Sequence, residues 1–347
     1  MLYRYGTAVL LALLSPLASA EKLTLLNWEA YLAPDVIEQW ESETGVSVEQ
    51  VYFDNDERRD RMMVDASRHN IDLVVLDEVA SRLFGERGVS FAPSVEQAPN
   101  LNHIDPRFQQ QCGEHSIPYM WGTLGIAYRS DKVSLPPTSW SALVRPAPEM
   151  NGHIGMMDDG TDMLAPALLM RDQSINSASR EVLQTAFEDL KQQEPAVLTY
   201  DYAITYLQSR PEANELYMAL VYSGDQGVLN EISGSEHWQY VVPDEGSILW
   251  ADCLAIIRGS EHEALAMRFI DFLNRPDIAA RNAESLWVAT PNSAALELID
   301  PEFRADLTIY PPPEVMAKSQ IYEVLSDDNV MLRKRITGAI RKLHDAQ

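Results

Sequence analysis

The stretch KLTLLNWEAYLAPDVIEQWESETGVSVEQVYF (22–53) decides the fold class, because it alternates a strand, a helix and a second strand. Residues 22–28 form a short β-like run. Residues 34–44 predict a helix with Pro34 in its first turn and Gly45 at its end. Residues 46–53 alternate apolar and polar side chains, and the aliphatic run IDLVVLD (71–77) is typical of a strand buried on both faces. The sequence predicts an α/β protein with a parallel sheet.

A second region with the same character follows a proline-rich connector near residue 130. Its apolar runs are IPYMWGTLGIAYR (117–129), ELYMALVYSGD (215–225) and WQYVVPDEGSILWADCLAII (238–257). Residues 153–170 predict a strand, a polar turn and a helix. We therefore expect two parallel-sheet regions in one chain.

The first twenty residues are predicted to be a signal peptide. Arg4 precedes an apolar run, and Ala18-Ser19-Ala20 forms a small-x-small cleavage signature. A membrane-anchoring helix is the alternative, but the run is too short to span a bilayer. We expect export and a soluble mature protein that starts near Glu21.

The formal net charge of −25 restricts the partners of this protein. Nucleic-acid binding needs clustered Lys and Arg against the phosphates, so we expect no nucleic-acid partner. An acidic chain attracts small cations by long-range steering. Acidity that only aids solubility is the alternative interpretation.

The two cysteines, Cys112 and Cys253, lie far apart in the sequence. In an oxidising compartment they either form one disulfide or remain two buried thiols. Neither has the spacing of a zinc site. The histidines show no metal-ligand spacing, and nucleophile-elbow and phosphate-loop motifs are missing. Asp159 and Asp162 as a glycosidase pair have no other support, so we predict no enzyme, no cofactor and no metal.

Acidic and aromatic residues recur where the predicted strands end. Ligands of parallel sheets bind beyond the carboxyl ends of strands. A linear polyamine needs carboxylates at intervals for its ammonium groups and aromatic faces over its methylenes. Taken singly, Asp158 and Asp159 are more typical of helix N-caps, and a Trp or Tyr in an apolar run is more typical of the core. Trp250 and Asp252, within the apolar run SILWADCLAI (247–256), show the combination most clearly.

Several segments resemble a known family in the same order along the chain. They are LLNWEAYL (25–32), ETGVSV (43–48), DLVV (72–75), SIPYMWGTLGIAY (116–128), VVPDEGSILWADCLAI (241–256), FLNRPDIAAR (272–281) and ATPN (289–292). The chain resembles the periplasmic spermidine/putrescine-binding proteins of ABC transporters. This resemblance implies a two-lobed periplasmic binding protein of type II with a ligand cleft between the lobes. It places residues 21–127 and 253–296 in lobe 1, and residues 128–252 and 297–347 in lobe 2.

The resemblance also implies a ligand set. The residues that match the family pattern, or replace one of its aromatic residues, are Trp28, Tyr31, Asp159, Asp162, Tyr222, Trp250 and Asp252. Two departures from the family pattern add further acids. The acid that the family has after Asn-Trp stands one place earlier here, as Glu29, and Asp77 stands where the family has Ser. The aromatic residue expected at Val288 is missing, and the adjacent Trp287 is its expected substitute.

The resemblance implies that the protein binds a linear polyamine of the spermidine, norspermidine or putrescine type in the periplasm. It then presents the ligand to an inner-membrane ABC permease. One alternative is a polyamine sensor that signals through a membrane cyclic-di-GMP receptor to control biofilm formation. A second alternative is the binding of a different small solute.

Overall fold

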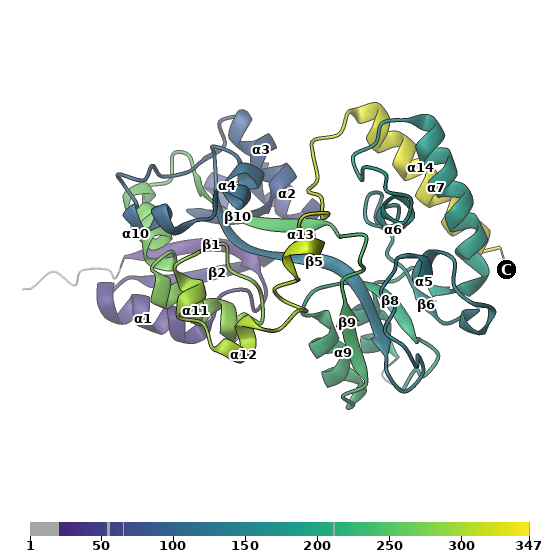
Figure 1. Cartoon of the computed structure of the whole chain (residues 1–347). Helices are drawn as coiled ribbons and strands as arrows, with labels where there is room; N and C mark the ends of the chain where they lie inside the picture. The colour runs from purple at the N-terminus through teal and green to yellow at the C-terminus, as the bar shows by residue number, and fades with distance from the viewer. Residues whose placement is uncertain (1–20, 54–55, 65, 211, 347) are drawn as a thin grey trace, which may run out of the picture.

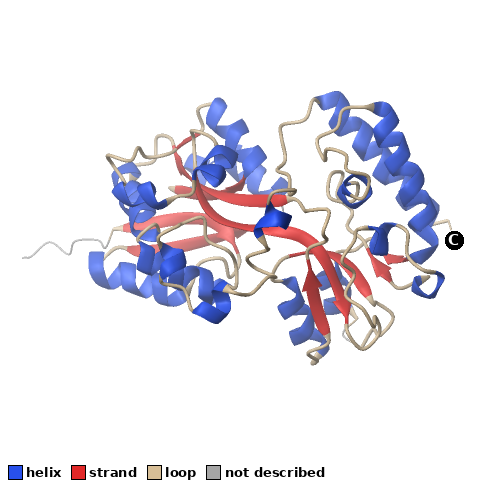
Figure 2. Cartoon of the chain, in the orientation of Figure 1, coloured by secondary structure: helices blue, strands red, loops and turns tan. Residues whose placement is uncertain are grey.

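The computed structural model describes residues 21–53, 56–64, 66–210 and 212–346. Figure 1 shows two lobes joined by long strands that run through the middle of the molecule, and Figure 2 shows sheet flanked by helices in both lobes. The predicted signal peptide, residues 1–20, lies outside the described residues.

The first lobe begins with the strand, helix and strand expected from the sequence. Strands β1 (Lys22–Trp28), β2 (Ser47–Phe53) and β3 (Leu73–Asp77) run parallel, with β1 between the other two. Helix α1 (Pro34–Thr44) ends at Gly45, whose φ of 72° is a left-handed conformation that glycine adopts without a Cβ clash. The predicted helix and strands are thus confirmed here.

The strands that connect the lobes are antiparallel, which differs from the prediction of two parallel-sheet regions. Strand β5 (Ile117–Arg129) pairs antiparallel with β10 (Leu249–Ile257) over its first half and with β8 (Met218–Tyr222) and β9 (Trp238–Val241) over its second half. The strands form one ten-stranded sheet that contains the order β2-β1-β3-β10-β5-β8-β6-β7. The direction follows from topology, because β5 carries the chain out of the first lobe and β10 brings it back.

The remaining elements cover the two halves of this sheet. In the first lobe they are α2 (Asp56–Val64), α3 (Glu78–Glu86), β4 (Ser90–Phe91), α4 (Pro106–Cys112), α10 (Glu263–Leu273), α11 (Pro276–Leu286) and α12 (Pro301–Arg304). In the second lobe they are α5 (Ser141–Val144), β6 (Ile154–Gly155), α6 (Ala165–Leu169), α7 (Arg180–Gln193), β7 (Val197–Thr199), α8 (Ala203–Ser209), α9 (Asp225–Ser233) and α14 (Asp327–His344). Helix α13 (Pro313–Met316) lies between the lobes.

Apolar packing changes partners inside the crossing strands. On β5, Met120 packs in the core of the first lobe, whereas Leu124 packs in that of the second. Ile299 and Phe303 share a buried cluster with Phe108 of the first lobe. We therefore propose that the first lobe extends past the expected boundary at residue 296 and includes α12.

A disulfide joins Cys112, at the end of α4, to Cys253 on β10, across a sequence separation of 141 residues. Both cysteines are fully buried. The structure thus selects the disulfide from the two states that the sequence left open. Within the described residues, no helix is both long and apolar enough to cross a membrane.

Candidate functional site

Two carboxylates from the first lobe meet on neighbouring strands. Asp77 ends β3 and lies directly opposite Asp252 of β10 in the antiparallel register. Directly opposed residues in such a ladder project from the same face of the sheet. The Asp77 carboxylate accepts hydrogen bonds from Ala80 N (2.7 Å), at the start of α3, and from Arg59 Nη1 (2.8 Å). It is thus a helix N-cap and an ion-pair partner at once.

The Asp252 carboxyl is held in a different electrostatic environment. The β10–β5 pairing has an irregularity immediately after this residue, where the ladder register shifts. Burial raises the pKa of Asp252 to about 7; the negative charge of Asp77 adds to the rise, and the neighbouring Tyr31 hydroxyl opposes it. This acid is poised to ionise fully when a cation approaches.

Tyr31 is fixed beside Asp252 by a short polar network. The Tyr119 hydroxyl donates to the Tyr31 carbonyl oxygen (2.8 Å), and Asn282 Nδ2 donates to the Tyr119 hydroxyl (2.9 Å). The two tyrosine rings pack edge to face with centroids 5.8 Å apart. Burial raises the pKa of Tyr31 well above its usual value, so the phenol remains neutral, and its buried hydroxyl makes no hydrogen bond within the described residues.

Trp250 lies two residues before Asp252 on the same strand. It pairs in register with Gly122 of β5, where an added Cβ would lie 2.3 Å from Trp250 Cζ2. Glycine therefore makes room for the indole at this crossing point. The ring meets Tyr222 edge-on with centroids 6.3 Å apart. The indole N–H is buried and makes no hydrogen bond within the described part of the chain.

Asp162 is the corresponding buried acid of the second lobe. It is 6% exposed and accepts hydrogen bonds from the hydroxyls of Tyr222, at the end of β8, and Tyr322. Burial raises its pKa to about 7, with a further rise from the negative charge of Asp159 and a smaller one from Asp56; the two phenols oppose the rise. The two charged groups that raise the pKa of Asp162, Asp159 and Asp56, are thus both carboxylates.

The other predicted acids before α6 have structural partners. Asp159 Oδ1 accepts from the backbone N–H groups of Thr161 (2.7 Å) and Asp162 (2.8 Å), and Asp158 forms an ion pair with Arg341 of α14. Asp159 therefore acts as an N-cap-like turn residue while its charge still reaches the neighbouring Asp162. The capping alternative raised by the sequence accounts for its backbone contacts.

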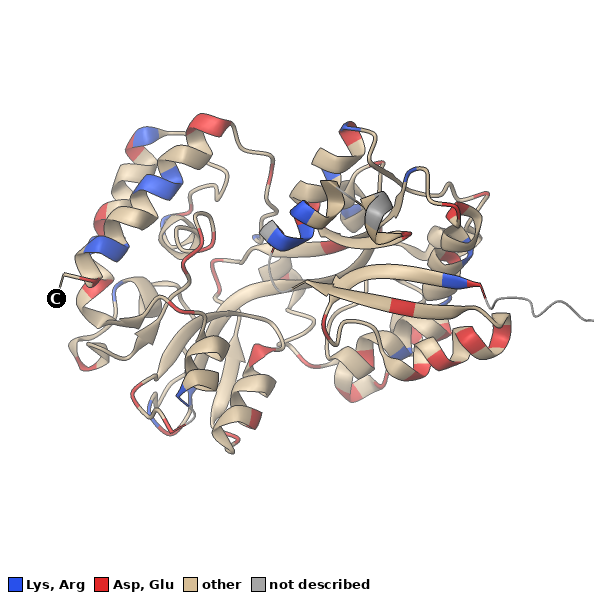
Figure 3. Ribbon diagram, turned by 180° about the vertical axis from the view of Figure 1, so that it is seen from behind, with Lys and Arg blue, Asp and Glu red and all other residues tan. Residues whose placement is uncertain are grey.

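Acids from the two lobes influence one another electrostatically. Partial burial raises the pKa of Asp56, on α2, and the negative charges of Asp77 and Asp159 add to the rise, while Arg59 opposes it. Asp159 belongs to the second lobe, so these carboxylates interact across the space between the lobes. Figure 3 shows basic residues on α2 and acids on the loop before α6, on the facing sides of the two lobes.

The sequence interpretation missed Asp56 and Arg59 and did not assign Tyr322 to the site. It also missed Asp225, at the start of α9, which accepts hydrogen bonds from the Tyr202 hydroxyl and from Tyr222 N (2.7 Å). Burial raises the pKa of Asp225 to about 7. The signal that was available for Asp225 is its position three residues after the end of β8, in the segment that contains Tyr222.

Two of the other predicted residues lie at the edge of this group. Trp28 packs on Phe53 with ring centroids 4.3 Å apart, and it also borders the apolar core that Tyr31 contacts. Glu29 is exposed in the turn that follows β1. The Glu29 carboxylate is thus accessible to water.

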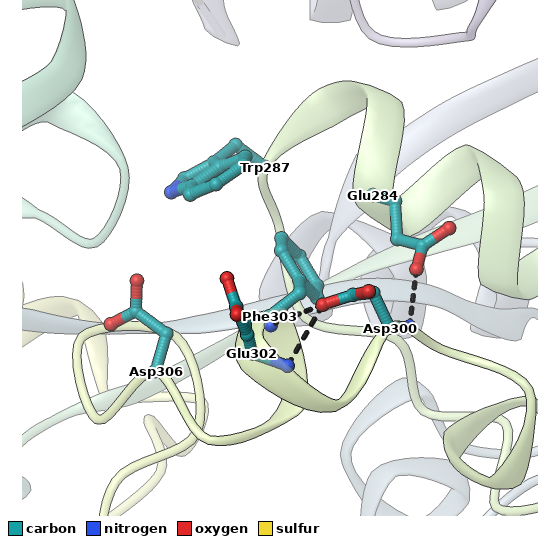
Figure 4. Close-up of a pocket in the computed structure, with 6 residues that line it drawn as sticks. All are labelled: Glu284, Trp287, Asp300, Glu302, Phe303 and Asp306. Atoms are coloured by element: carbon teal, nitrogen blue, oxygen red, sulfur yellow. Dashed lines mark hydrogen bonds between the residues drawn. The ribbon is translucent and has the colours of Figure 1, made fainter.

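Trp287 lines an open pocket of about 360 Å³, shown in Figure 4. The pocket is also lined by Glu284, Asp300, Glu302, Phe303 and Asp306. The indole is half exposed and meets the Phe303 ring edge-on at 5.1 Å. Val288, the next residue, packs toward the core that Trp28 and Tyr31 border. The Trp287 carbonyl oxygen lies beside Gly224, two residues after Tyr222, where an added Cβ would lie 3.5 Å from it. The role of Trp287 as the substitute for the aromatic residue missing at Val288 stays a prediction.

The gathered residues form a group of acids beside aromatic rings, and all of these acids except the exposed Asp159 are buried or half-buried. Asp77, Asp252, Tyr31 and Trp250 come from the first lobe and the crossing strand, and Asp159, Asp162 and Tyr222 come from the second lobe. Such a group offers charge-assisted hydrogen bonds to ammonium groups and aromatic faces to the carbon chain between them.

Comparison with known proteins gives the family. The model of the bacterial extracellular solute-binding proteins matches residues 35–309. The norspermidine sensor of Vibrio cholerae is 38% identical over 347 residues, which covers 100% of this chain and 96% of the sensor. The spermidine/putrescine-binding periplasmic protein of Escherichia coli is 28% identical over 319 residues, covering 87% of this chain and 89% of that protein.

A solved structure gives the same result for the fold. The substrate-binding protein of a spermidine/putrescine ABC transporter from Streptococcus pneumoniae superimposes with a TM-score of 0.83 at 25% identity, covering 93% of this chain and 99% of that one. The expected two-lobed fold of a type II periplasmic binding protein is confirmed. The chain belongs to the bacterial extracellular solute-binding protein family.

Proposed function

We propose that this protein is a periplasmic solute-binding protein whose ligand is a linear polyamine, held between the lobes. One observation carries the proposal: Asp162 and Asp252, one on each side of the space between the lobes, are both carboxyls whose pKa is raised to about 7 by burial. A polyamine brings two or more ammonium groups on one flexible chain. It can therefore neutralise both acids at once.

The aromatic residues support the same ligand class. Trp250 and Tyr222 lie beside these carboxyls, and a cation over such a ring gains about 0.5–2 kcal/mol. The ligand-binding roles of Trp28, Glu29, Tyr31, Asp77, Asp159 and Trp287 remain part of the proposal. The names of the sensor and transport relatives support polyamines independently of the geometry.

Thermal unfolding and calorimetry test the proposal directly. The protein is stripped of ligand by unfolding and refolding, and then titrated with putrescine, spermidine, norspermidine and spermine. A ligand that binds only the folded state raises the melting temperature, and the rise increases with concentration. The proposal fails if no polyamine shifts the melting temperature or gives a heat of binding.

Sensing is a second candidate for the role that polyamine binding serves, beside delivery to an ABC permease. The observation in its favour is the higher identity to the norspermidine sensor, 38%, than to the E. coli transport component, 28%. In both roles the ligand stabilises a closed arrangement of the lobes by its differential affinity. Adjacent permease and ATPase genes would favour transport, and an adjacent membrane signalling gene would favour sensing.

A further inference from the structure

Arg59 is a buried cation among the acids of the first lobe. Its side chain is 2% exposed and forms three ion pairs. Nη1 lies 2.8 Å from both Asp56 Oδ1 and Asp77 Oδ2, and Nη2 lies 2.9 Å from Asp60 Oδ1. A guanidinium held by several carboxylates in fixed geometry is a rigid, permanently charged group.

These ion pairs place Arg59 at the end of the proposed polyamine site. Asp77 is directly opposite Asp252 in the strand register, and the positive charge of Arg59 opposes the rise in the pKa of Asp252. On its other side, Asp56 interacts electrostatically with Asp159 of the second lobe. The guanidinium thus lies between two carboxylates that face the acids of the site.

An ammonium group of a ligand would find the same two carboxylates attractive. Arg59 offsets one of their two negative charges and fills the space between them, so a further cation at this point meets the guanidinium at short range and is repelled by it. The site therefore favours ligands that have no ammonium group at the position of Arg59. The length of the accepted ligand then depends on a side chain that need not touch it.

We propose that Arg59 sets the upper limit on ligand charge, by occupying the position between Asp56 and Asp77 that a fourth ammonium group would otherwise take. The inference rests on the proposed polyamine-binding function and deepens it. It predicts that triamines are preferred over tetraamines. Arg59 is a specificity-determining residue, and its removal opens the two acids to a longer, more highly charged polyamine.

The test compares norspermidine, a triamine, with spermine, a tetraamine, by calorimetry. In the wild type norspermidine is expected to bind more tightly. Arg59→Gln is expected to shift the ratio of the two dissociation constants at least tenfold toward spermine. Arg59→Lys keeps the charge, and Arg275→Gln removes an arginine that pairs with Glu43 and Asp277 away from the site. Both controls are expected to leave the ratio within twofold.

A purely structural Arg59 gives a different result. Its replacement would lower the melting temperature and weaken both amines alike, so an unchanged ratio in folded Arg59→Gln overturns the inference. If that variant does not fold, the double variant Arg59→Gln/Asp60→Asn, which removes one of the acids left unpaired, is judged by the same ratio. A wild type that binds neither these two amines nor putrescine or spermidine overturns the proposed function and this inference with it. A wild type that prefers spermine overturns only the role of Arg59.

Discussion

Asp77 and Asp252 lie directly opposite each other on β3 and β10, yet their partners differ. Asp77 is held by Arg59 and by the backbone N–H at the start of α3, whereas Asp252 faces the Tyr31 hydroxyl and has a raised pKa. A carboxylate already paired with a cation contributes little to attracting another. The two acids look equivalent in the sequence, but their partners distinguish them. Asp252 is the stronger candidate for ammonium binding.

The first prediction concerns Asp252→Asn. The change keeps the shape of the side chain and removes its charge, and a hydrogen bond to a charged group contributes about 1.5–3 kcal/mol. We expect polyamine affinity to fall at least tenfold. The melting temperature of the ligand-free protein at pH 8 should stay the same or rise, because an ionised buried carboxyl no longer has to be accommodated.

Calorimetry and thermal unfolding of the same preparations measure both quantities. Asp277→Asn, on the exposed start of α11 where Asp277 pairs with Arg275, is the matched control and should not alter affinity. A large loss of stability with unchanged affinity would instead identify Asp252 as a structural residue.

The second prediction is a dependence of binding on pH. The folded-state pKa values of Asp162 and Asp252, about 7, lie above the value of about 3.9 for an unfolded chain. Their contribution to the stability of the ligand-free fold is therefore complete below about pH 4 and is lost as pH rises through 7. Polyamine binding has the opposite sign, because ammonium groups favour the ionised carboxylates.

We expect affinity to increase about ten- to a hundredfold between pH 6 and pH 8, with protons released on binding at pH 6. Calorimetry at pH 6 in two buffers of different ionisation enthalpy measures the protons released. Asp162→Asn should release fewer protons than the wild type. Equal heats in both buffers, together with an affinity that does not change with pH, would contradict the assignment of these two acids.

Local patterns were sufficient to predict much of the first lobe. The apolar alternation and the placement of Pro34 and Gly45 specify β1, α1 and β2, because these elements depend on neighbours in the sequence. The direction of β10 was not predictable from local patterns. A strand of the same composition fits a parallel or an antiparallel sheet. Only the path of the chain between the lobes determines the direction of β10 relative to its neighbours.

The candidate site was predictable only in part for the same reason. Asp162, Trp250 and Asp252 were found because acid and aromatic residues are unusual within or directly after apolar runs. Arg59 was not found, because it lies in a polar helix where the sequence around it indicates a solvated surface. Its burial results from Asp77, eighteen residues later, and that contact depends on tertiary structure.

The third prediction concerns the disulfide between α4 and β10. The chain-entropy model for a loop closed over 141 residues gives about 5 kcal/mol of stabilisation, which is an upper value because the unfolded chain retains structure. We expect Cys112→Ala/Cys253→Ala to unfold at a lower denaturant concentration than the oxidised wild type. Polyamine affinity well below the melting temperature should change less than threefold, because the β3–β10 ladder still positions Asp252.

Denaturant titrations of the double variant, the oxidised wild type and the reduced wild type measure this effect. The reduced wild type is the control for the lost side-chain volume, since it keeps both sulfur atoms. Equal midpoints for all three proteins would show that the link adds nothing to stability. A large loss of affinity in a folded double variant would show that Cys253 positions Asp252.

The fourth prediction separates two tryptophans that the sequence placed in one site. Trp250 packs between Gly122 and Tyr222 next to Asp252, whereas Trp287 lines the open pocket with Phe303. We expect Trp250→Ala to weaken polyamine binding at least tenfold, because the ring supplies both apolar cover and cation–π attraction. Trp287→Ala should change affinity less than twofold.

The variants Trp250→Phe and Trp287→Phe serve as controls for cavity formation, since each keeps an aromatic ring. Calorimetry with norspermidine gives the affinities, and quenching of tryptophan fluorescence in each variant reports which indole senses the ligand. Removal of Trp250 should abolish most of the ligand-dependent fluorescence change, and removal of Trp287 should preserve it. The reverse pattern would mean that closure of the lobes carries Trp287 to the ligand, and that it does take the place of the aromatic residue missing at Val288.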